Sequence, residues 1–224
     1  MMTIITVALA PAIALLIFIY QKDRYDREPP QLLFKNFYLG VFSTVPVYFV
    51  EKFLMSREHS SNPLYQAFVV AGFTEELFKY IIVRNVSYKS SYYDEKLDGI
   101  VYSVFVSLGF ASAENLLYVL SSSSNFLYTG IARAISAVPA HMLFAISMGY
   151  YLSLAKFSRN RISSMFYSIE SLFVPIILHG IYDYILISKI YGYMPLFIIF
   201  VIALWKINLK KLNKYADDSR RSHS

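Results

Sequence analysis

Cysteine is absent from this chain of 224 residues, and charged residues make up only 16% of it. The absence of cysteine excludes disulfides, thiolate nucleophiles and thiolate metal sites. An ordinary soluble domain carries about 25% charged residues, so the low charged fraction argues against a cytosolic enzyme. Glycine and proline are also scarce, at 8 each, which excludes collagen-like and low-complexity proteins. The class that remains is a membrane protein.

Hydrophobic residues make up 56% of the chain, and they gather in runs close to the roughly 20 residues that cross a bilayer. The first run precedes its basic residues instead of following them, so we interpret it as a retained anchor and not as a signal peptide. The sequence therefore predicts an all-α, multi-spanning transmembrane helix bundle of about seven spans. They are Thr3–Tyr20, Phe34–Phe53, Leu64–Val83, Gly99–Leu120, Thr129–Ala155, Ile169–Ile187 and Tyr191–Ile207.

Lysine and arginine concentrate in every second connection between these runs. The alternate connections hold only Lys52, Arg57 and Lys189, and Arg133 lies just inside the fifth run. The positive-inside rule then predicts that the N-terminus lies outside and the C-terminus in the cytoplasm, with residues 208–224 as a basic cytoplasmic tail. The formal charge of +6 is accounted for by orientation in the lipid bilayer, and we expect no nucleic-acid partner. The basic connections contain Lys22, Arg24, Arg27 and Lys35, then Arg84, Lys89 and Lys96, then Lys156, Arg159 and Arg161.

The third run carries ionisable residues near its middle, where the bilayer makes a charge costly. Lys79 follows Glu75 by four residues and Glu76 by three, so its ammonium can reach back to a carboxylate on the same helix face. Adjacent residues point about 100° apart, which predicts that one lysine cannot pair well with both glutamates. A salt bridge that lets the helix insert is the structural alternative. The carboxylate predicted to be left over favours a functional role.

Two histidines lie near the middle of other runs. Asp183 comes one helical turn after His179 and can hold one ring nitrogen, which leaves the other for a metal, water or substrate. A helix-packing contact is the alternative interpretation of this pair. His141 follows Pro139, where a kink can bend the helix around a cavity, although a lone histidine is more often a contact between helices.

The fourth run adds Glu114 and Asn115, which form either a second ligand set or a polar anchor across the bundle. Because each residue advances a helix by about 1.5 Å, all these groups are predicted to share one layer of the bundle.

Taken in order, these residues resemble the motifs of the PrsW family of intramembrane proteases, which belongs to a wider group with the CAAX prenyl endopeptidases. The resemblance implies one membrane-embedded protease domain over residues 1–224, with catalytic helices at about 64–187, that cuts a membrane-anchored protein such as a single-pass anti-sigma factor. It also implies that Glu75, Glu76 and His179 are essential. The CAAX-type pattern has Glu-Glu-x-x-x-Arg and a histidine after the phenylalanine, so Lys79 and Glu114 argue against prenylated substrates. The matching motifs are Glu75-Glu76-x-x-Lys79, Phe110-x-x-x-Glu114-Asn115, Pro139-x-His141 and His179-x-x-x-Asp183.

Two hydrolytic mechanisms suit these residues. In the first, Glu75 or Glu76 is the general base on water, and His179, oriented by Asp183, stabilises the oxyanion. His141 assists it. In the second, His141, His179 and Glu76 hold Zn²⁺, and another glutamate acts on the bound water. The chain has no His-Glu-x-x-His motif, which favours the first mechanism.

Two other functional classes remain open from the sequence. A proton-coupled transporter also places acidic and histidine side chains near the midplane, but no inverted repeat or matched pair of broken helices supports it. In a noncatalytic membrane scaffold, the same groups would only hold helices together.

Overall fold

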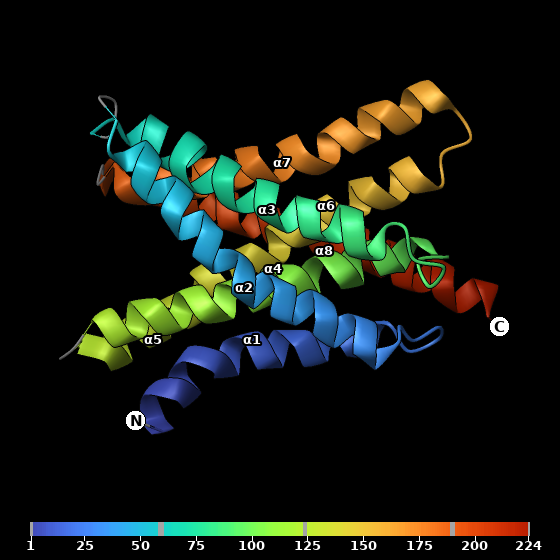
Figure 1. The fold of residues 1–224 in the computed structure, drawn as a ribbon, viewed down its shortest axis with the longest axis horizontal. Coiled ribbons are helices and arrows are strands. Elements are labelled where there is room, and N and C mark those ends of the chain that lie inside the picture. The colour runs from blue at the N-terminus through green and yellow to red at the C-terminus, as the bar shows by residue number, and fades with distance from the viewer. Residues whose placement is uncertain (1, 58–60, 123–124, 189–190, 224) are drawn as a thin grey trace.

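The computed structural model describes residues 2–57, 61–122, 125–188 and 191–223, and these residues contain helices and no strand. This confirms the predicted all-α class. The helices run back and forth in a bundle, and their connections gather at two opposite ends (Figure 1). One end holds the connections after α1, η2 and α6 together with the C-terminus. The other end holds the N-terminus and the connections after α2, α4 and α7.

The chain order is α1 (Met2–Lys22), α2 (Pro30–Met55), η1 (Tyr65–Phe73), α3 (Thr74–Ile82), η2 (Val83–Ser87), α4 (Lys96–Ser121), α5 (Phe126–Ile135), α6 (Ala137–Lys156), α7 (Arg161–Ile187), η4 (Tyr191–Tyr193) and α8 (Met194–Ser222). Helix α4 is the centre of the bundle and packs most extensively against α6 and α2. Its residues are buried almost throughout the first four turns, which matches a helix surrounded by others on all sides.

Within the described residues, five helical segments are long and apolar enough to cross a membrane. They are Thr3–Lys22, Pro30–Met55, Lys96–Ser121, Phe126–Lys156 and Arg161–Ile187. The predicted third and seventh spans do not meet the same standard of length and composition. The third contains the charged group of α3, and the seventh is only the first half of α8, which continues into a polar half. Seven crossings and the orientation therefore remain predictions. Lys189 lies outside the described residues.

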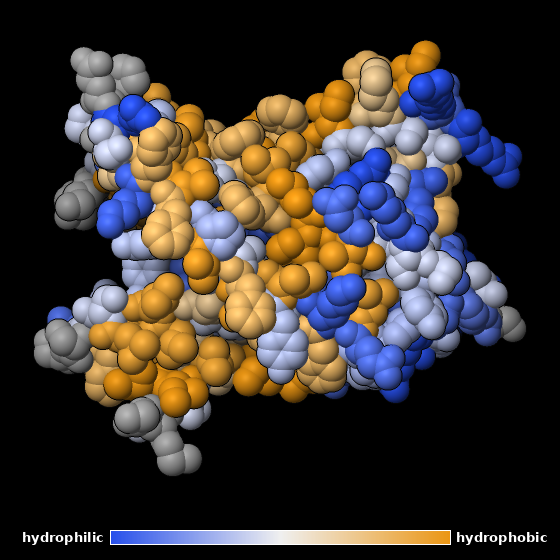
Figure 2. Space-filling view, in the orientation of Figure 1, coloured by the Kyte–Doolittle hydropathy of each residue, from blue (hydrophilic) through white to orange (hydrophobic). Residues whose placement is uncertain are grey.

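Apolar side chains cover the middle of the molecular surface, and hydrophilic ones gather at the ends (Figure 2). The large apolar side chains that are exposed include Phe42 and Phe49 of α2 and Phe173 of α7. In water such a surface would drive aggregation, whereas against lipid tails it costs nothing. The surface is that of a multi-pass membrane protein.

Two predicted spans differ in detail from the sequence interpretation. The fifth is interrupted at Ser136, between α5 and α6, three residues before the expected kink at Pro139. Pro139 lies in the first turn of α6, where backbone N–H groups have no partner within the helix. Its missing N–H therefore removes no helical hydrogen bond, and no kink is needed. The basic tail is not separate from the bundle, because α8 runs unbroken through it and stacks Tyr215 on Tyr150 of α6.

Candidate functional site

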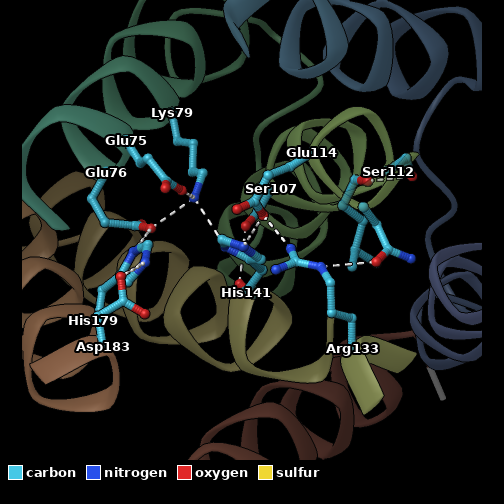
Figure 3. Close-up of polar contacts among 12 residues, drawn as sticks. Glu75, Glu76, Lys79, Ser107, Ser112, Glu114, Arg133, His141, His179 and Asp183 are labelled. Atoms are coloured by element: carbon cyan, nitrogen blue, oxygen red, sulfur yellow. Dashed lines mark hydrogen bonds and ion pairs between the residues drawn. The ribbon is translucent and has the colours of Figure 1, made fainter. Parts of the chain in front are cut away.

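The carboxylates of α3 point toward the centre of the bundle, and a single lysine binds both of them (Figure 3). The Nζ atom of Lys79 lies 3.0 Å from Oε2 of Glu75 and 2.8 Å from Oε1 of Glu76. The prediction that one glutamate is left over was wrong, because spacings of three and four residues bracket the lysine and its long side chain bends between them. Of these two carboxylates, that of Glu76 has an oxygen, Oε2, that is buried without a hydrogen-bond partner among the described residues.

Glu76 also contacts the histidine of α7. Nδ1 of His179 lies 3.0 Å from Oε1 of Glu76, and its Nε2 lies 3.4 Å from Oδ2 of Asp183. The expected His179–Asp183 pair is therefore present, and the second ring nitrogen faces a carboxylate. The backbones of η1 and α7 approach at Gly72 and Gly180, where a side chain on either residue would meet the facing helix. This close packing brings His179 to the carboxylates of α3.

His141 on α6 joins this group from the opposite side. Its Nδ1 lies 3.1 Å from Nζ of Lys79, and its Nε2 lies 2.9 Å from Oε2 of Glu114. Ser107 of α4 donates a hydrogen bond to the backbone carbonyl of His141 at 2.9 Å, which ties α6 to the central helix. Since an ammonium only donates, Nδ1 of His141 accepts from Lys79 and the ring presents Nε2–H to Glu114.

The polar pair of α4, Glu114 and Asn115, anchors this helix to its neighbours. Arg133 of α5 donates to Oε2 of Glu114 at 2.8 Å and to Oδ1 of Asn115 at 2.9 Å, and Asn115 in turn donates to the carbonyl of Ala8 in α1 at 2.7 Å. Asn115 thus holds three helices together, while Glu114 orients the ring of His141. Sequence reasoning noted Arg133 only as a charge inside a span. An arginine one short helix away from an intramembrane Glu-Asn pair was the available signal.

Four of the predicted residues converge on one point. Glu75, Glu76, His141 and His179 each offer a ligand atom within 4.8 Å of the others, from α3, α6 and α7. The predicted common layer is confirmed for them. Their exposed fractions are 5%, 0%, 4% and 3%. Aromatic rings surround them: Phe144 stacks on His179 with centroids 5.0 Å apart, and the ammonium of Lys79 lies 4.3 Å from the centroid of Phe110.

A cavity of about 750 Å³ reaches this point. Glu75, His141 and His179 line it, whereas Glu76 and Lys79 lie behind them. The other lining residues come from η1, from the C-terminal halves of α2, α4 and α7, and from the α5–α6 junction with the first turns of α6. These parts meet at the end of the bundle that holds the N-terminus (Figure 1), so the cavity extends toward that end.

Glu51 of α2 also lines the cavity, and sequence reasoning missed it. The signal was present, since Glu51 is an acidic residue within the apolar second run. With Glu51 included, five carboxylates and three basic side chains line the cavity or lie at its floor among the described residues. The carboxylates are Glu51, Glu75, Glu76, Glu114 and Asp183, and the cations are Lys52, Lys79 and Arg133.

This donor set suits a metal ion. Carboxylate oxygens and neutral imidazole nitrogens are ordinary ligands of Zn²⁺. The unpartnered Oε2 of Glu76 is a buried oxygen that a divalent cation would satisfy. The four converging residues therefore fit a metal.

Comparisons with known proteins agree with the motifs. A sequence model of the family described as "PrsW family intramembrane metalloprotease" matches residues 28–205. The chain is 44% identical over 218 residues to Protease PrsW of Clostridioides difficile, covering 96% of this chain and 92% of that protein. It is 38% identical over 217 residues to Protease PrsW of Bacillus subtilis, covering 96% of each. No solved structure matches the chain.

Proposed function

The chain belongs to the PrsW family of intramembrane metalloproteases, and from this premise we propose that its cavity hydrolyses a peptide bond of a membrane-anchored protein at the point where Glu75, His141 and His179 meet. The observation that carries the proposal is the convergence of four ligand-type side chains from three helices at the floor of an open cavity. Buried ionisable groups are costly in a membrane protein, and they persist where they perform a function.

The metal expected from the family description would be held by His141, His179 and Glu76, with Zn²⁺ as the ion that best suits two imidazoles and a carboxylate. When bound, such an ion polarises the scissile carbonyl and lowers the pKa of water. The sequence analysis favoured direct activation of water by a glutamate, and this proposal differs from it. The reason is that four donor side chains converge on one point, which the separate motifs could not reveal.

The protein side chains divide the remaining work by their position. Glu75 faces the cavity, so its carboxylate can accept a proton from water and later deliver it to the leaving amine. Glu76 lies behind it. Asp183 holds Nε2 of His179, so Nδ1, which faces Glu76, is the nitrogen that would bind the metal. Glu114 orients His141. The apolar rings of Phe110 and Phe144 exclude bulk water, which strengthens each of these interactions.

The direction of the cavity favours a substrate segment that enters from the end with the N-terminus, which the positive-inside rule puts outside the cell. A single-pass anti-sigma factor cut near its outer membrane boundary is the substrate class that we propose. The catalytic helices then extend from η1 to α7, within the predicted range 64–187.

Reconstitution in liposomes with candidate single-pass substrates tests the proposal. Glu75→Gln, Glu76→Gln and His179→Ala should each lower cleavage at least 100-fold, because each removes a base, a ligand or an orienting contact. Glu170→Gln, on α7 but outside the site, is the matched control and should keep wild-type activity.

Metal analysis of the same preparations separates the two hydrolytic mechanisms. Chelation should abolish cleavage and zinc should restore it, with about one zinc per chain in wild type and less in His141→Ala and His179→Ala. Full activity in protein stripped of metal would reject the metal and leave direct glutamate catalysis. Substrate-dependent ion flux without cleavage would reject the protease assignment of the cavity in favour of transport.

A further inference from the structure

A second group of buried carboxylates lies at the opposite end of the bundle from the cavity, and nothing in the proposed hydrolysis uses it. Its members are Asp23 and Glu28, from the connection between α1 and α2, and Glu95 and Asp98, at the start of α4. We call these four residues the acidic cluster. Asp98 precedes Glu114 by sixteen residues on α4, or about 24 Å along the helix, so the cluster is far from the site described above.

Backbone amides account for part of the cluster. Oδ2 of Asp98 accepts hydrogen bonds from the backbone N–H groups of Asp94 at 2.9 Å and Glu95 at 2.7 Å, as a residue near a helix N-terminus does. Oδ2 of Asp23 accepts from the backbone N–H of Glu28 at 3.1 Å, and the hydroxyl of Tyr102 donates to Glu28. Helix capping and loop closure therefore explain one oxygen of each aspartate.

The other oxygens have no such explanation. Oδ1 of Asp23, Oε1 of Glu95 and Oδ1 of Asp98 are buried and receive no hydrogen bond from an N–H group of the described residues. Asp98 contacts Glu28 through their two carboxyl groups, and Glu95 contacts the side chain of Ser219 in α8. Both aspartates are 0% exposed. Buried carboxylate oxygens without an N–H donor are costly, so three in one place require a compensating group, which can be a shared proton or a cation.

Lys156 and Arg27 form no ion pair with these carboxylates. The nearby cations have other contacts. Nζ of Lys156 donates to the carbonyl of Tyr88 at 2.8 Å and lies 4.2 Å from the centroid of Tyr93, and the guanidinium of Arg27 lies over the ring of Tyr20. The positive charge that the cluster needs does not come from these two side chains.

The spacing of the oxygens suits a metal ion. Asp23, Glu95 and Asp98 each offer one oxygen, and these three atoms lie within 4.8 Å of one another. Ca²⁺ binds oxygen at about 2.3–2.6 Å, so two ligands on opposite sides of the ion are up to about 5 Å apart. Mg²⁺ and Mn²⁺ take the same oxygen donors at slightly shorter distances.

We propose that the acidic cluster is a binding site for one hard divalent cation, held by Asp23, Glu95 and Asp98 and distinct from the site in the cavity. The ion ties the connection between α1 and α2 to the first turn of α4, which is the central helix of the bundle. The ion therefore stabilises the fold, and it can affect the cavity only indirectly, through helix α4.

Mn²⁺ binding to the full-length protein in detergent, followed by electron paramagnetic resonance after removal of all metals, measures the site directly. Asp98→Asn and Asp23→Asn should each lose one tight Mn²⁺ per chain, or weaken it at least tenfold. Asp94→Asn is the matched control, because Asp94 is exposed and carries the same charge in the same connection. His179→Ala should retain this Mn²⁺, which separates the acidic cluster from the cavity.

Thermal unfolding gives a second measurement. Ca²⁺ at about 100 times its dissociation constant should raise the Tm of wild type and of Asp94→Asn by roughly 5–10 °C, and should leave that of Asp98→Asn unchanged. Glu95→Gln replaces the aspartate variants if they do not fold, since Glu95 is only half-buried. Equal Mn²⁺ binding in all variants, or a wild type that Ca²⁺ does not stabilise, overturns the proposal in favour of shared protons.

Discussion

Replacing Lys79 with methionine tests whether its ammonium neutralises the two carboxylates of α3. Methionine has a similar length and an apolar end, so Lys79→Met removes the charge without opening a large cavity. The ammonium is 1% exposed and lies within 3.0 Å of both Glu75 and Glu76, which are themselves 5% and 0% exposed. Removing one partner from a buried ion pair costs roughly 3–5 kcal/mol, because the remaining charge has no compensation.

For a chain of this length a change of 1 kcal/mol shifts the Tm by about 2–4 °C, so we expect Lys79→Met to lower it by roughly 6–20 °C. Thermal unfolding in detergent measures the shift. Lys210→Met, on the exposed face of α8, is the control and should change the Tm by no more than about 2 °C. The double variant Glu75→Gln with Lys79→Met should recover part of the loss, because it removes one of the two uncompensated charges.

Zinc should stabilise Lys79→Met more than wild type, since it supplies the missing positive charge. The reasoning is refuted if Lys79→Met unfolds within about 2 °C of wild type, or if the second substitution gives no recovery. Either result would mean that the carboxylates are protonated or hydrated, and that the short contacts of Lys79 contribute little to stability.

Three further predictions concern the rest of the molecule. A reporter fused after Arg161 should be cytoplasmic and one inserted at Ser122 should be outside, and finding both on the same side would contradict the predicted orientation. Burial raises the pKa of Asp23 from 3.8 to about 7 and that of Glu28 from 4.5 to about 7. The folded protein therefore holds more protons than the unfolded chain between about pH 4 and pH 7. Without divalent cations, the Tm should fall as the pH rises through that window. A Tm that does not change with pH there would contradict the prediction. Gly149→Ala should destabilise the fold by about 2 kcal/mol or more, because a Cβ there would overlap the carbonyl of Gly99 where α6 crosses α4. Gly192→Ala is the control in the same unfolding assay and should have no effect, because the space around Gly192 is open.

The sequence predicted the bundle and much of the site for a physical reason. Charges inside apolar runs are so costly that Glu75, Glu76, His141 and His179 could be identified without any knowledge of their neighbours. The spacing also gave the Lys79 contacts within one helix. It could not give contacts between helices, so the roles of Arg133 and Glu51 depended on how α5 and α2 pack.

The limits of the sequence are also clear in the span boundaries. The average hydropathy of Thr129–Ala155 predicts one helix, because the break at Ser136 involves few residues and does not change the composition of the run. The acidic cluster was invisible for the opposite reason. Asp23, Glu28, Glu95 and Asp98 lie in connections or at a helix end, where acidic residues are ordinary, and only the fold shows that they are buried together.

The charged middle of the third helical segment has a consequence for how the protein is made. Glu75, Glu76 and Lys79 leave that segment outside the group of helices that are apolar enough to enter a bilayer alone. The histidines that accompany these charges come much later, His141 following Lys79 by 62 residues and His179 following Glu76 by 103. During synthesis the segment is therefore a poor insertion unit, and its place in the membrane becomes stable only when α6 and α7 have been translated. Assembly of the polar centre and completion of membrane insertion are then the same event, so a chain truncated before α7 should be recognised by quality control as incompletely inserted.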